Sequence, residues 1–363
     1  MSRRTLTALV AGMLSFPAVA LAQSSVTITG MIKMAAETVK LGNSAKTPSS
    51  EGRIADELSR VIFQVTEDLG GGLQAVAQID WRVVPDAGTD ATSGNNWVGF
   101  RSRDWGALLV GRVDLHYHHS PSELTAKAGS LKAWNVSLLS FAGGGGTAVG
   151  LGTRTANLVR YESPNWGGLA FTASYSMNPA SAEADLGSTA RKGSAWNFVP
   201  SYAARDWQIA WSHWRSKPDA LAALDQKADR LWGSYAWGGF KIGLAWDRAK
   251  LTSGTTGITT SNRTAWSVPL RYATAAHTFY IEYTKARDDK ATAAADGARM
   301  VALAYNYDLS KRTSLGLTYA RITNQAGAFY NLFNSAAAQG SASAAVAPGE
   351  DPRIWSLGMR HSF

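Results

Sequence analysis

The chain has 363 residues and no cysteine, carries a formal charge of +9 and is 45% hydrophobic. The lack of cysteine excludes disulfides and thiolate metal sites, and the hydrophobic content excludes a disordered chain. The basic residues stand singly rather than in clusters, which argues against nucleic-acid binding and favours anionic solutes or anionic surfaces as partners.

The N-terminal segment, residues 1–22, is expected to be a secretory signal peptide. It has a basic start at Arg3 and Arg4, an apolar run over residues 6–21 and an A-x-A cleavage pattern at residues 20–22. A transmembrane anchor is the alternative, but the apolar stretch is short for it. The mature chain, residues 23–363, is expected to be a single domain, and loss of the two arginines lowers the formal charge from +9 to +7.

The rest of the chain offers no run of about 18 apolar residues, so the exported protein is either soluble or crosses a membrane as a closed β-barrel. Alternation with a period of two dominates this part and predicts strands. We count roughly sixteen candidate strands: residues 26–33, 59–68, 73–82, 95–102, 107–114, 157–164, 171–177, 196–203, 207–214, 230–237, 240–247, 264–272, 277–286, 299–308, 313–322 and 354–363.

The connections between these strands alternate between short turns and long loops. The long ones are Leu41–Leu58, Val84–Gly94, His116–Thr153, Asn178–Ser194, Ser216–Lys227, Lys250–Asn262, Asp288–Gly297 and Thr323–Glu350. Such regularity is typical of an up-and-down barrel in an outer membrane and is not expected of a Greek-key sandwich.

The two faces of the predicted strands indicate which side of the barrel is apolar. In SRVIFQVTED, Val61, Phe63 and Val65 lie opposite Arg60, Ile62 and Gln64. Many tryptophans and tyrosines stand near strand ends, where a membrane–water boundary favours them. A soluble barrel buries its inner face, whereas here the inner face carries Arg, Gln, Asp and Thr, so the apolar face is expected to contact lipid.

The final strand, IWSLGMRHSF, shows the same division. Its larger residues, from Trp355 to Phe363 in steps of two, are expected to face lipid or a neighbouring subunit. Ser356, Gly358, Arg360 and Ser362 are expected to face the lumen. We expect this strand to pair with the first one, near residues 26–33, and to close the barrel without an edge.

Several segments resemble the general porins of Gram-negative outer membranes, particularly the β-proteobacterial type. The similar segments are SSVTITG, SRVIFQVTEDLGGGLQA, WVGFRSRDWGALLVGR, RTANLVRYESPNWGGLAF and the terminal GMRHSF. The resemblance implies a 16-stranded antiparallel transmembrane β-barrel, with short periplasmic turns, long external loops and a homotrimeric assembly. It also implies that the terminal Phe363 helps the outer-membrane assembly machinery to recognise the chain.

In this family the third long loop folds into the lumen and narrows it. The corresponding segment here is about residues 116–153, which includes ELTAKAGSLKAW, a stretch that could form a short helix, and a GGGG run. An external loop is the alternative. Its place among the loops and the resemblance favour the lumen.

The resemblance also implies basic residues on the barrel wall at the constriction. Arg60, Arg112 and Arg154 match basic wall positions, and alternation independently places Arg60 and Arg112 inside. Alternation alone places Lys33 and Arg82 inside. The alternative for each is a solvated charge with little effect on conductance.

Two departures from the family pattern bear on selectivity. Where the family has an arginine before the W-V-G strand, this chain has Gly94 or Asn95, and Arg82 could supply the missing charge. The lumen loop is also poor in acids, with Glu123 inside it and Asp114 just before it. Rings of charged side chains bias which ions enter a pore, so we expect a positive field and a preference for anions.

The predicted function is therefore passive diffusion of small hydrophilic solutes and ions, preferentially anions, with no enzymatic activity and no cofactor. A substrate-specific channel for a small anionic solute is the alternative. An enzyme barrel would need a clustered acid, base and nucleophile, which the sequence does not show. A soluble sugar-binding protein is a further alternative.

The HYHH stretch (residues 116–119) is interpreted as a polar loop cluster rather than a metal site. Outer-membrane lipid and lipopolysaccharide are expected partners.

Overall fold

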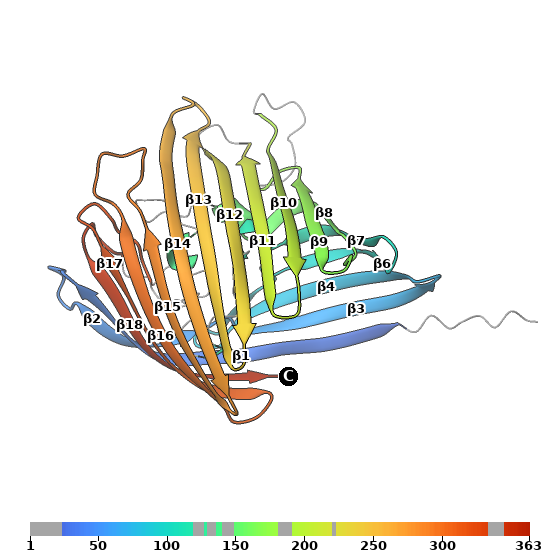
Figure 1. The fold of residues 1–363 in the computed structure, drawn as a ribbon, viewed down its shortest axis with the longest axis horizontal. Helices are drawn as coiled ribbons and strands as arrows, with labels where there is room; N and C mark the ends of the chain where they lie inside the picture. Colours follow the sequence, from blue (N-terminus) through green and yellow to red (C-terminus); the bar gives the residue numbers. More distant parts are fainter. Residues whose placement is uncertain are drawn as a thin grey trace, which may run out of the picture.

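Backbone pairing runs around the molecule as one closed antiparallel sheet (Figure 1). The computed structural model describes residues 24–118, 127–128, 136–139, 149–180, 191–219, 223–332 and 345–363. The predicted signal peptide lies outside these residues. No helix in the described part of the chain is long and apolar enough to cross a membrane.

The strands follow one another along the chain with little helix between them. Their bounds are β1 Ser25–Gly42, β2 Ser50–Asp56, β3 Arg60–Gly70, β4 Leu73–Val84, β5 Thr89–Ala91, β6 Asn96–Ser102, β7 Gly106–Val113, β8 Thr155–Glu162, β9 Leu169–Ser176, β10 Ser194–Ala203, β11 Trp207–Lys217, β12 Leu224–Trp237, β13 Phe240–Ser253, β14 Thr259–Thr274, β15 His277–Ala286, β16 Ala298–Asp308, β17 Thr313–Asn324 and β18 Asp351–Ser362. Among the described residues between β7 and β8 there are three short helices, η1 His116–His118, α2 Val136–Leu139 and η3 Gly150–Gly152.

These 18 strands form a wall that is 16 strands wide. Strands β2 and β3 lie end to end and both pair with β1, and β5 and β6 both pair with β4. Each pair is therefore one wall strand interrupted by a short break. The predicted 16-stranded antiparallel barrel is confirmed.

The barrel closes where the two ends of the chain meet. Strand β1 pairs with β18 in a register that runs from Met31 opposite Ser362 to Gly42 opposite Asp351. Directly after β18, Phe363 exchanges two backbone hydrogen bonds with Gly30 of β1, with N···O distances of 3.1 and 3.2 Å. The pairing predicted for the last strand is thus present, and it leaves no open edge in the sheet.

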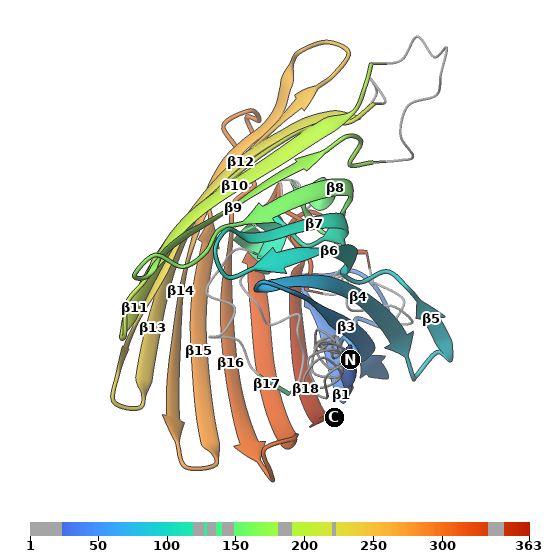
Figure 2. The ribbon, with the colours of Figure 1, turned by 90° about the vertical axis from the view of Figure 1, so that its right-hand side faces the viewer.

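Short turns gather at one end of the barrel and longer connections at the other, as the sequence predicts (Figure 2). Four predicted loops are shorter than expected. Strand β2 lies inside Leu41–Leu58, β5 lies inside Val84–Gly94, and β11 to β14 extend into Ser216–Lys227 and Lys250–Asn262. Strands that continue beyond an apolar band no longer need apolar outer residues, so their polar ends read as loops in the sequence.

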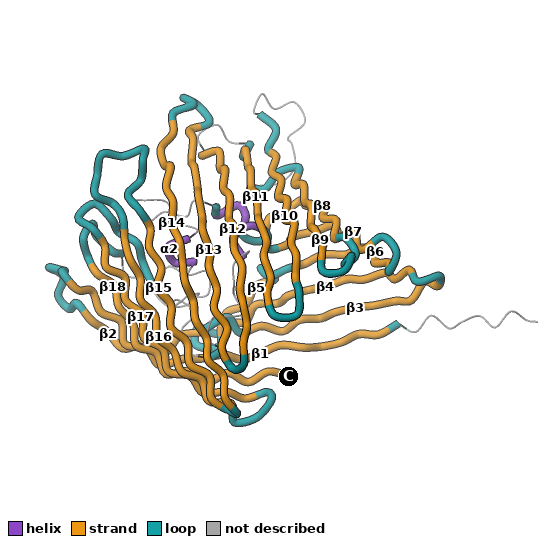
Figure 3. The backbone as a smooth tube through the Cα atoms, viewed as in Figure 1, coloured by secondary structure: helices purple, strands orange, loops and turns teal. Residues whose placement is uncertain are grey.

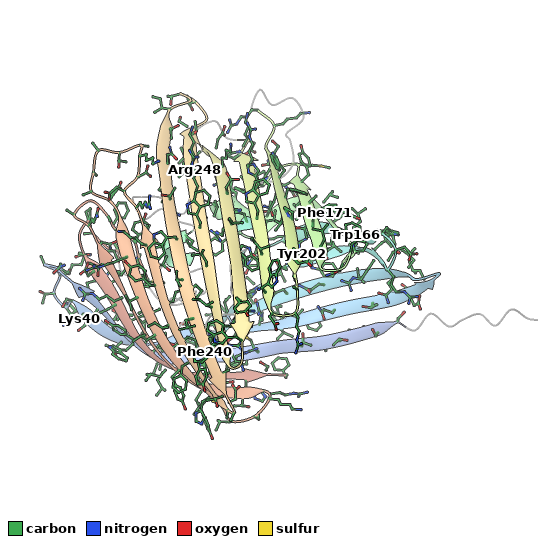
Figure 4. The ribbon with its side chains drawn as sticks, in the orientation of Figure 1. Lys40, Trp166, Phe171, Tyr202, Phe240 and Arg248 are labelled. Carbon is green, nitrogen blue, oxygen red and sulfur yellow. The ribbon has the colours of Figure 1, made fainter. Side chains whose placement is uncertain are left out.

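The outer face of the wall is apolar and bordered by aromatic rings. Trp355, Leu357 and Met359 of β18 are 52%, 62% and 49% exposed, whereas the alternating Ser356 is buried. Near the short turns the rings touch one another, as in the group of Trp166, Phe171 and neighbouring side chains (Figure 4). The predicted division of the final strand into an outer apolar face and an inner polar face is confirmed.

A glycine at the seam leaves room for the terminal aromatic ring. A Cβ atom on Gly30 would lie 2.7 Å from Cζ of Phe363 and would also meet the carbonyl oxygen of Arg60. Further along β1, where it pairs with β2, a Cβ atom on Gly52 would meet only the carbonyl oxygen of Glu37, at 3.9 Å.

We expect Gly30→Ala to weaken closure of the barrel, because overpacking typically costs about 1–3 kcal/mol. The measurement is the heat-dependent shift of the folded barrel in gel electrophoresis after refolding in detergent. Gly52→Ala is the control and should fold like the natural chain. Equal folding of both variants would show that the seam tolerates the extra methyl group.

Candidate pore constriction

The described parts of the segment between β7 and β8 lie inside the barrel. Figure 3 shows its short helices behind the strands of the wall, and α2 contacts β14, β15 and β16. Leu138 and Leu139 of α2 are fully buried among small inward-facing residues, including Ala265, Ala286 and Ala302. Small residues on this part of the wall leave space for α2, so the described parts of this segment lie inside the barrel.

The beginning of the loop is fixed to β11, β12 and β13. Arg230 donates hydrogen bonds to the carbonyl oxygens of His116 (3.4 Å) and Tyr117 (3.0 Å). It also forms an ion pair with Asp247, at 2.9 Å. The His116 ring lies 2.8 Å from the Ser212 hydroxyl. Charged groups of the wall therefore hold the loop by its backbone.

The middle of the loop is fixed in the same way to β14 and β16, which follow β13 around the wall. Arg263 of β14 donates a hydrogen bond to the carbonyl oxygen of Leu139, at 2.6 Å. The Asn306 side chain of β16 accepts from the backbone of Lys127 (2.7 Å) and donates to the carbonyl of Ala128 (3.2 Å). The helix predicted over residues 123–134 lies mostly outside the described residues, and the described helical turn follows that stretch.

The interpretation of HYHH as a polar loop cluster is wrong for its first two residues. His116 and Tyr117 are buried against the wall. Burial lowers the pKa of His116 to about 4, because the charged form would lose its hydration, and the opposing charges of Asp247 and Asp229 do not compensate fully. Among the described residues, no group of three His, Asp or Glu side chains is arranged to hold a metal ion.

The predicted basic wall residues come together on the strands next to the seam. In the strand register Lys33 lies opposite Arg360, and Arg60 lies opposite Arg82. Arg60 is also close enough to Arg360 for their charges to repel each other. Lys33 is likewise close to both Arg60 and Arg360. Lys33 and Arg82 are nearly fully buried within the barrel, at 2% and 6% exposure.

Arg154 extends this cluster at the end of the loop. Burial lowers the pKa of its guanidinium, the Asp114 carboxylate opposes that shift, and the charges of Arg82 and Arg112 add to it. Arg112 follows Gly111 at a break in the register between β7 and β8. The alternation argument that placed Arg112 inside is wrong, because Leu108 and Val110, which share its parity, are on the outside. The break in the register, and not alternation, lets Arg112 lie beside the cluster.

Asp114 joins the two ends of the lumen loop. Its carboxylate accepts a hydrogen bond from the backbone N–H of Arg154, at 3.1 Å, and lies 3.2 Å from Nε2 of His118. Burial raises the pKa of Asp114, but the His118 hydrogen bond and the Arg154 charge lower it by more, so it lies well below the usual range. The carboxylate therefore stays ionised.

The missing family arginine has a local explanation. A side chain on Gly94 would collide with Asp80, whose carboxylate accepts a hydrogen bond from Arg82 at 2.6 Å. Arg82 thus occupies this region from the neighbouring strand, with its charge partly balanced by Asp80. Its Nε and Nη1 atoms, and Nε of Arg112, are buried and have no hydrogen-bond partner.

Basic groups exceed carboxylates in the described part of this cluster. Lys33, Arg60, Arg82, Arg112, Arg154 and Arg360 face Asp56, Glu57, Asp80 and Asp114. Sequence reasoning placed Arg360 on the inner face but did not assign it to the constriction. Its position in the inner set of the last strand, opposite Lys33, is the signal that could have done so. Glu123 lies outside the described residues.

Comparison with known proteins agrees with this architecture. The model of the family described as Gram-negative porin matches residues 5–327. This chain belongs to that family. As a member, it forms a channel in the outer membrane of a Gram-negative bacterium.

Three individual relatives share between 22% and 32% sequence identity with this chain. Outer membrane porin protein 32 of Delftia acidovorans is 25% identical over 358 residues, which are 95% of each protein. Major outer membrane protein P.IB of Neisseria meningitidis serogroup B is 32% identical, but the match covers 43% of this chain and 45% of that protein. Among solved structures, the anion-selective porin from Comamonas acidovorans has a TM-score of 0.75 at 22% identity, covering 94% of this chain and 100% of that one.

We expect acidification to loosen the start of the lumen loop. The pKa of His116 is about 4 in the folded protein, below the ordinary value of 6.5. Its contribution to stability is therefore complete above pH 6.5 and is lost as the pH falls towards 4. Single-channel recording should show more frequent conductance steps over this interval.

His116→Asn is the matched variant, because asparagine keeps a polar side chain but does not titrate there. Its channel should lack the added conductance steps on acidification. An identical pH response in both proteins would assign the effect to another group.

Proposed function

We propose that this porin conducts small hydrophilic solutes by passive diffusion and prefers anions to cations. The observation that carries the proposal is the excess of basic groups on the wall, together with unpaired buried donors on Arg82 and Arg112. A low-dielectric wall focuses the field of these charges across the opening. The similar porin from Comamonas acidovorans is described as anion-selective, which supports the proposal.

A dedicated channel for one small anionic solute remains the second candidate. The clustered arginines favour it, because planar guanidinium groups bind carboxylates and phosphates in a defined geometry. Swelling of liposomes in solutes of graded size and charge distinguishes the two. A general pore admits them by size and charge, whereas a dedicated channel saturates with one of them.

We expect Arg60→Glu to reduce the anion preference, because it replaces a positive charge by a negative one beside Arg82. The measurement is the reversal potential in a KCl gradient across a planar bilayer. Arg205→Glu is the control, because Arg205 is 94% exposed in a turn at the short-turn end. A cation-selective natural channel would overturn the proposed preference, and an unchanged reversal potential in Arg60→Glu would remove that residue from the constriction.

We also propose a homotrimer whose contacts lie on β1 to β7. A trimeric form is described for OmpT of Vibrio cholerae, whose fold is similar at a TM-score of 0.68 and 13% identity. Exposed outer residues on β9 to β18 include many aromatics, such as Trp196, Trp211, Trp246 and Trp355. Those on β1 to β7 are mainly aliphatic, such as Val98. Aromatic belts favour a lipid–water boundary, so the aliphatic face is the better candidate for protein contact.

We expect Val98→Trp to destabilise the trimer, because a packed interface cannot absorb the larger ring, at a cost of about 1–3 kcal/mol per subunit. Leu244→Trp on β13 is the matched control, since Val98 and Leu244 are 59% and 58% exposed. Lipid adapts to the added ring, so the control should keep its trimer. The measurement is the temperature of trimer dissociation in a semi-native gel, and equal temperatures would move the interface elsewhere.

Recognition of Phe363 by the outer-membrane assembly machinery is part of the same proposal. The ring is 42% exposed at the seam, so it is accessible at the end of the barrel. Gly30→Ala keeps this residue and therefore separates packing at the seam from recognition. Normal insertion in cells of a chain without Phe363 would argue against a signal role.

Lipopolysaccharide is proposed as the lipid around the long-loop end.

A further inference from the structure

Basic side chains on the outer wall face one another directly across three neighbouring strands. In the strand register Arg215 of β11 lies opposite Lys227 of β12, which lies opposite Lys250 of β13. These three residues are called the basic ladder here. Their side chains alternate with the buried Ser216, Ala228 and Ala249, so they are on the outside of the barrel and not in the pore.

Two rows beneath the ladder show how it differs from the rest of the wall. The next row down, His213, Asp229 and Arg248, contains a carboxylate between two basic groups, and His213 lies 2.6 Å from Asp229. The row below that is apolar and consists of Trp211, Leu231 and Trp246. Figure 4 shows Arg248 near the long-loop end of the barrel. The wall thus passes from apolar to balanced and then to basic.

The ladder has no anionic partner among the described residues. Like charges directly opposite each other destabilise an antiparallel pair. Among the described ion pairs none includes Arg215, Lys227 or Lys250, and the nearby Asp225 is already bound by Arg191 at 2.5 Å. The uncompensated charge indicates that an anion from outside the chain belongs here.

The same residues surround a depression of about 310 Å³. It is lined by the ladder together with Ser216, Lys217, Asp225, Gln226 and Thr252. A second depression of about 280 Å³ on the outer wall has the opposed pair Lys285 and Arg299 at its rim. Concave sites with several convergent cations are suited to phosphate groups.

The height of the ladder points to the phosphate of a lipid. It stands four residues beyond the tryptophan row, which is about 13 Å along a strand and about 10 Å along the axis of a tilted barrel. Tryptophan rings lie where hydrocarbon meets the headgroups. Groups roughly 10 Å further out lie at the level of charged headgroups rather than of hydrocarbon.

We propose that the basic ladder binds the phosphate groups of an anionic glycolipid in the outer leaflet. Lys227 occupies the centre, with Arg215 and Lys250 on either side, and the apolar row below contacts the acyl chains. The proposal rests on the outer-membrane location of the barrel. It concerns the outer wall alone, so ion selectivity is independent of it and the two can fail separately.

The test measures binding of lipid A carrying two phosphates to the purified full-length porin in detergent, by native mass spectrometry. Arg215→Gln combined with Lys227→Gln should weaken binding about 25-fold, since each basic group near an anionic surface contributes about a five-fold factor. Lys311→Gln combined with Arg312→Gln removes the same charge from an exposed turn at the other end of the barrel and should leave binding unchanged.

Two further measurements keep the result interpretable. Unchanged single-channel conductance shows that the ladder variant folds; should it not fold, Lys250→Gln alone provides the test, with about a five-fold loss expected. Equal binding by the ladder variant and the natural protein overturns the proposal, as does an equal loss in the turn variant. Inorganic phosphate that displaces lipid A at matching concentration would identify a free-anion site and overturn the assignment to lipid.

Discussion

Satisfaction of every backbone hydrogen bond inside a membrane is the constraint on which this structure depends. A strand in hydrocarbon finds no water to pair with its N–H and C=O groups, so the sheet must close. The closure rests on the register between β1 and β18 and on the two hydrogen bonds between Gly30 and Phe363. The terminal aromatic ring fits over a glycine because no other residue would leave that space.

Closure creates a lumen, and the described parts of the loop inside it are held by buried charge. Arg230 and Arg263 have no exposure, share the Asp247 carboxylate and each bind backbone carbonyls of the loop. Breaking a buried ion pair is costly, which makes this a firm attachment. In the proposed function, the basic cluster near the seam sets the field that a passing ion meets. Two sets of arginines are thus distinguished: Arg230 and Arg263 attach the loop, and the set near the seam is proposed to face the solute.

The outer wall is as differentiated as the lumen. Aliphatic residues on β1 to β7 suit contact with another subunit, aromatic belts on β9 to β18 suit lipid, and the basic ladder lies beyond the belt at the long-loop end. Each zone suits one medium. Aliphatic side chains pack against protein, and aromatic rings with an apolar body and a polar tip suit the boundary between hydrocarbon and headgroups. Basic side chains suit the phosphate of the headgroups. The barrel is a single sheet, yet its outer wall has three zones that suit three different environments.

The sequence by itself determined the alternation, the strand count, the order of short and long connections and the face on which Arg60, Lys33 and Arg82 lie, because all of these follow from a period of two between lipid and water. It could not show that β2 and β5 continue wall strands, since polar strand ends resemble loops. Only the tertiary structure decided that His116 is buried, that Asp80 excludes a side chain at Gly94, and that Arg215, Lys227 and Lys250 stand in one row. These depend on register between strands far apart in the chain, and periodicity within one strand carries no information about register.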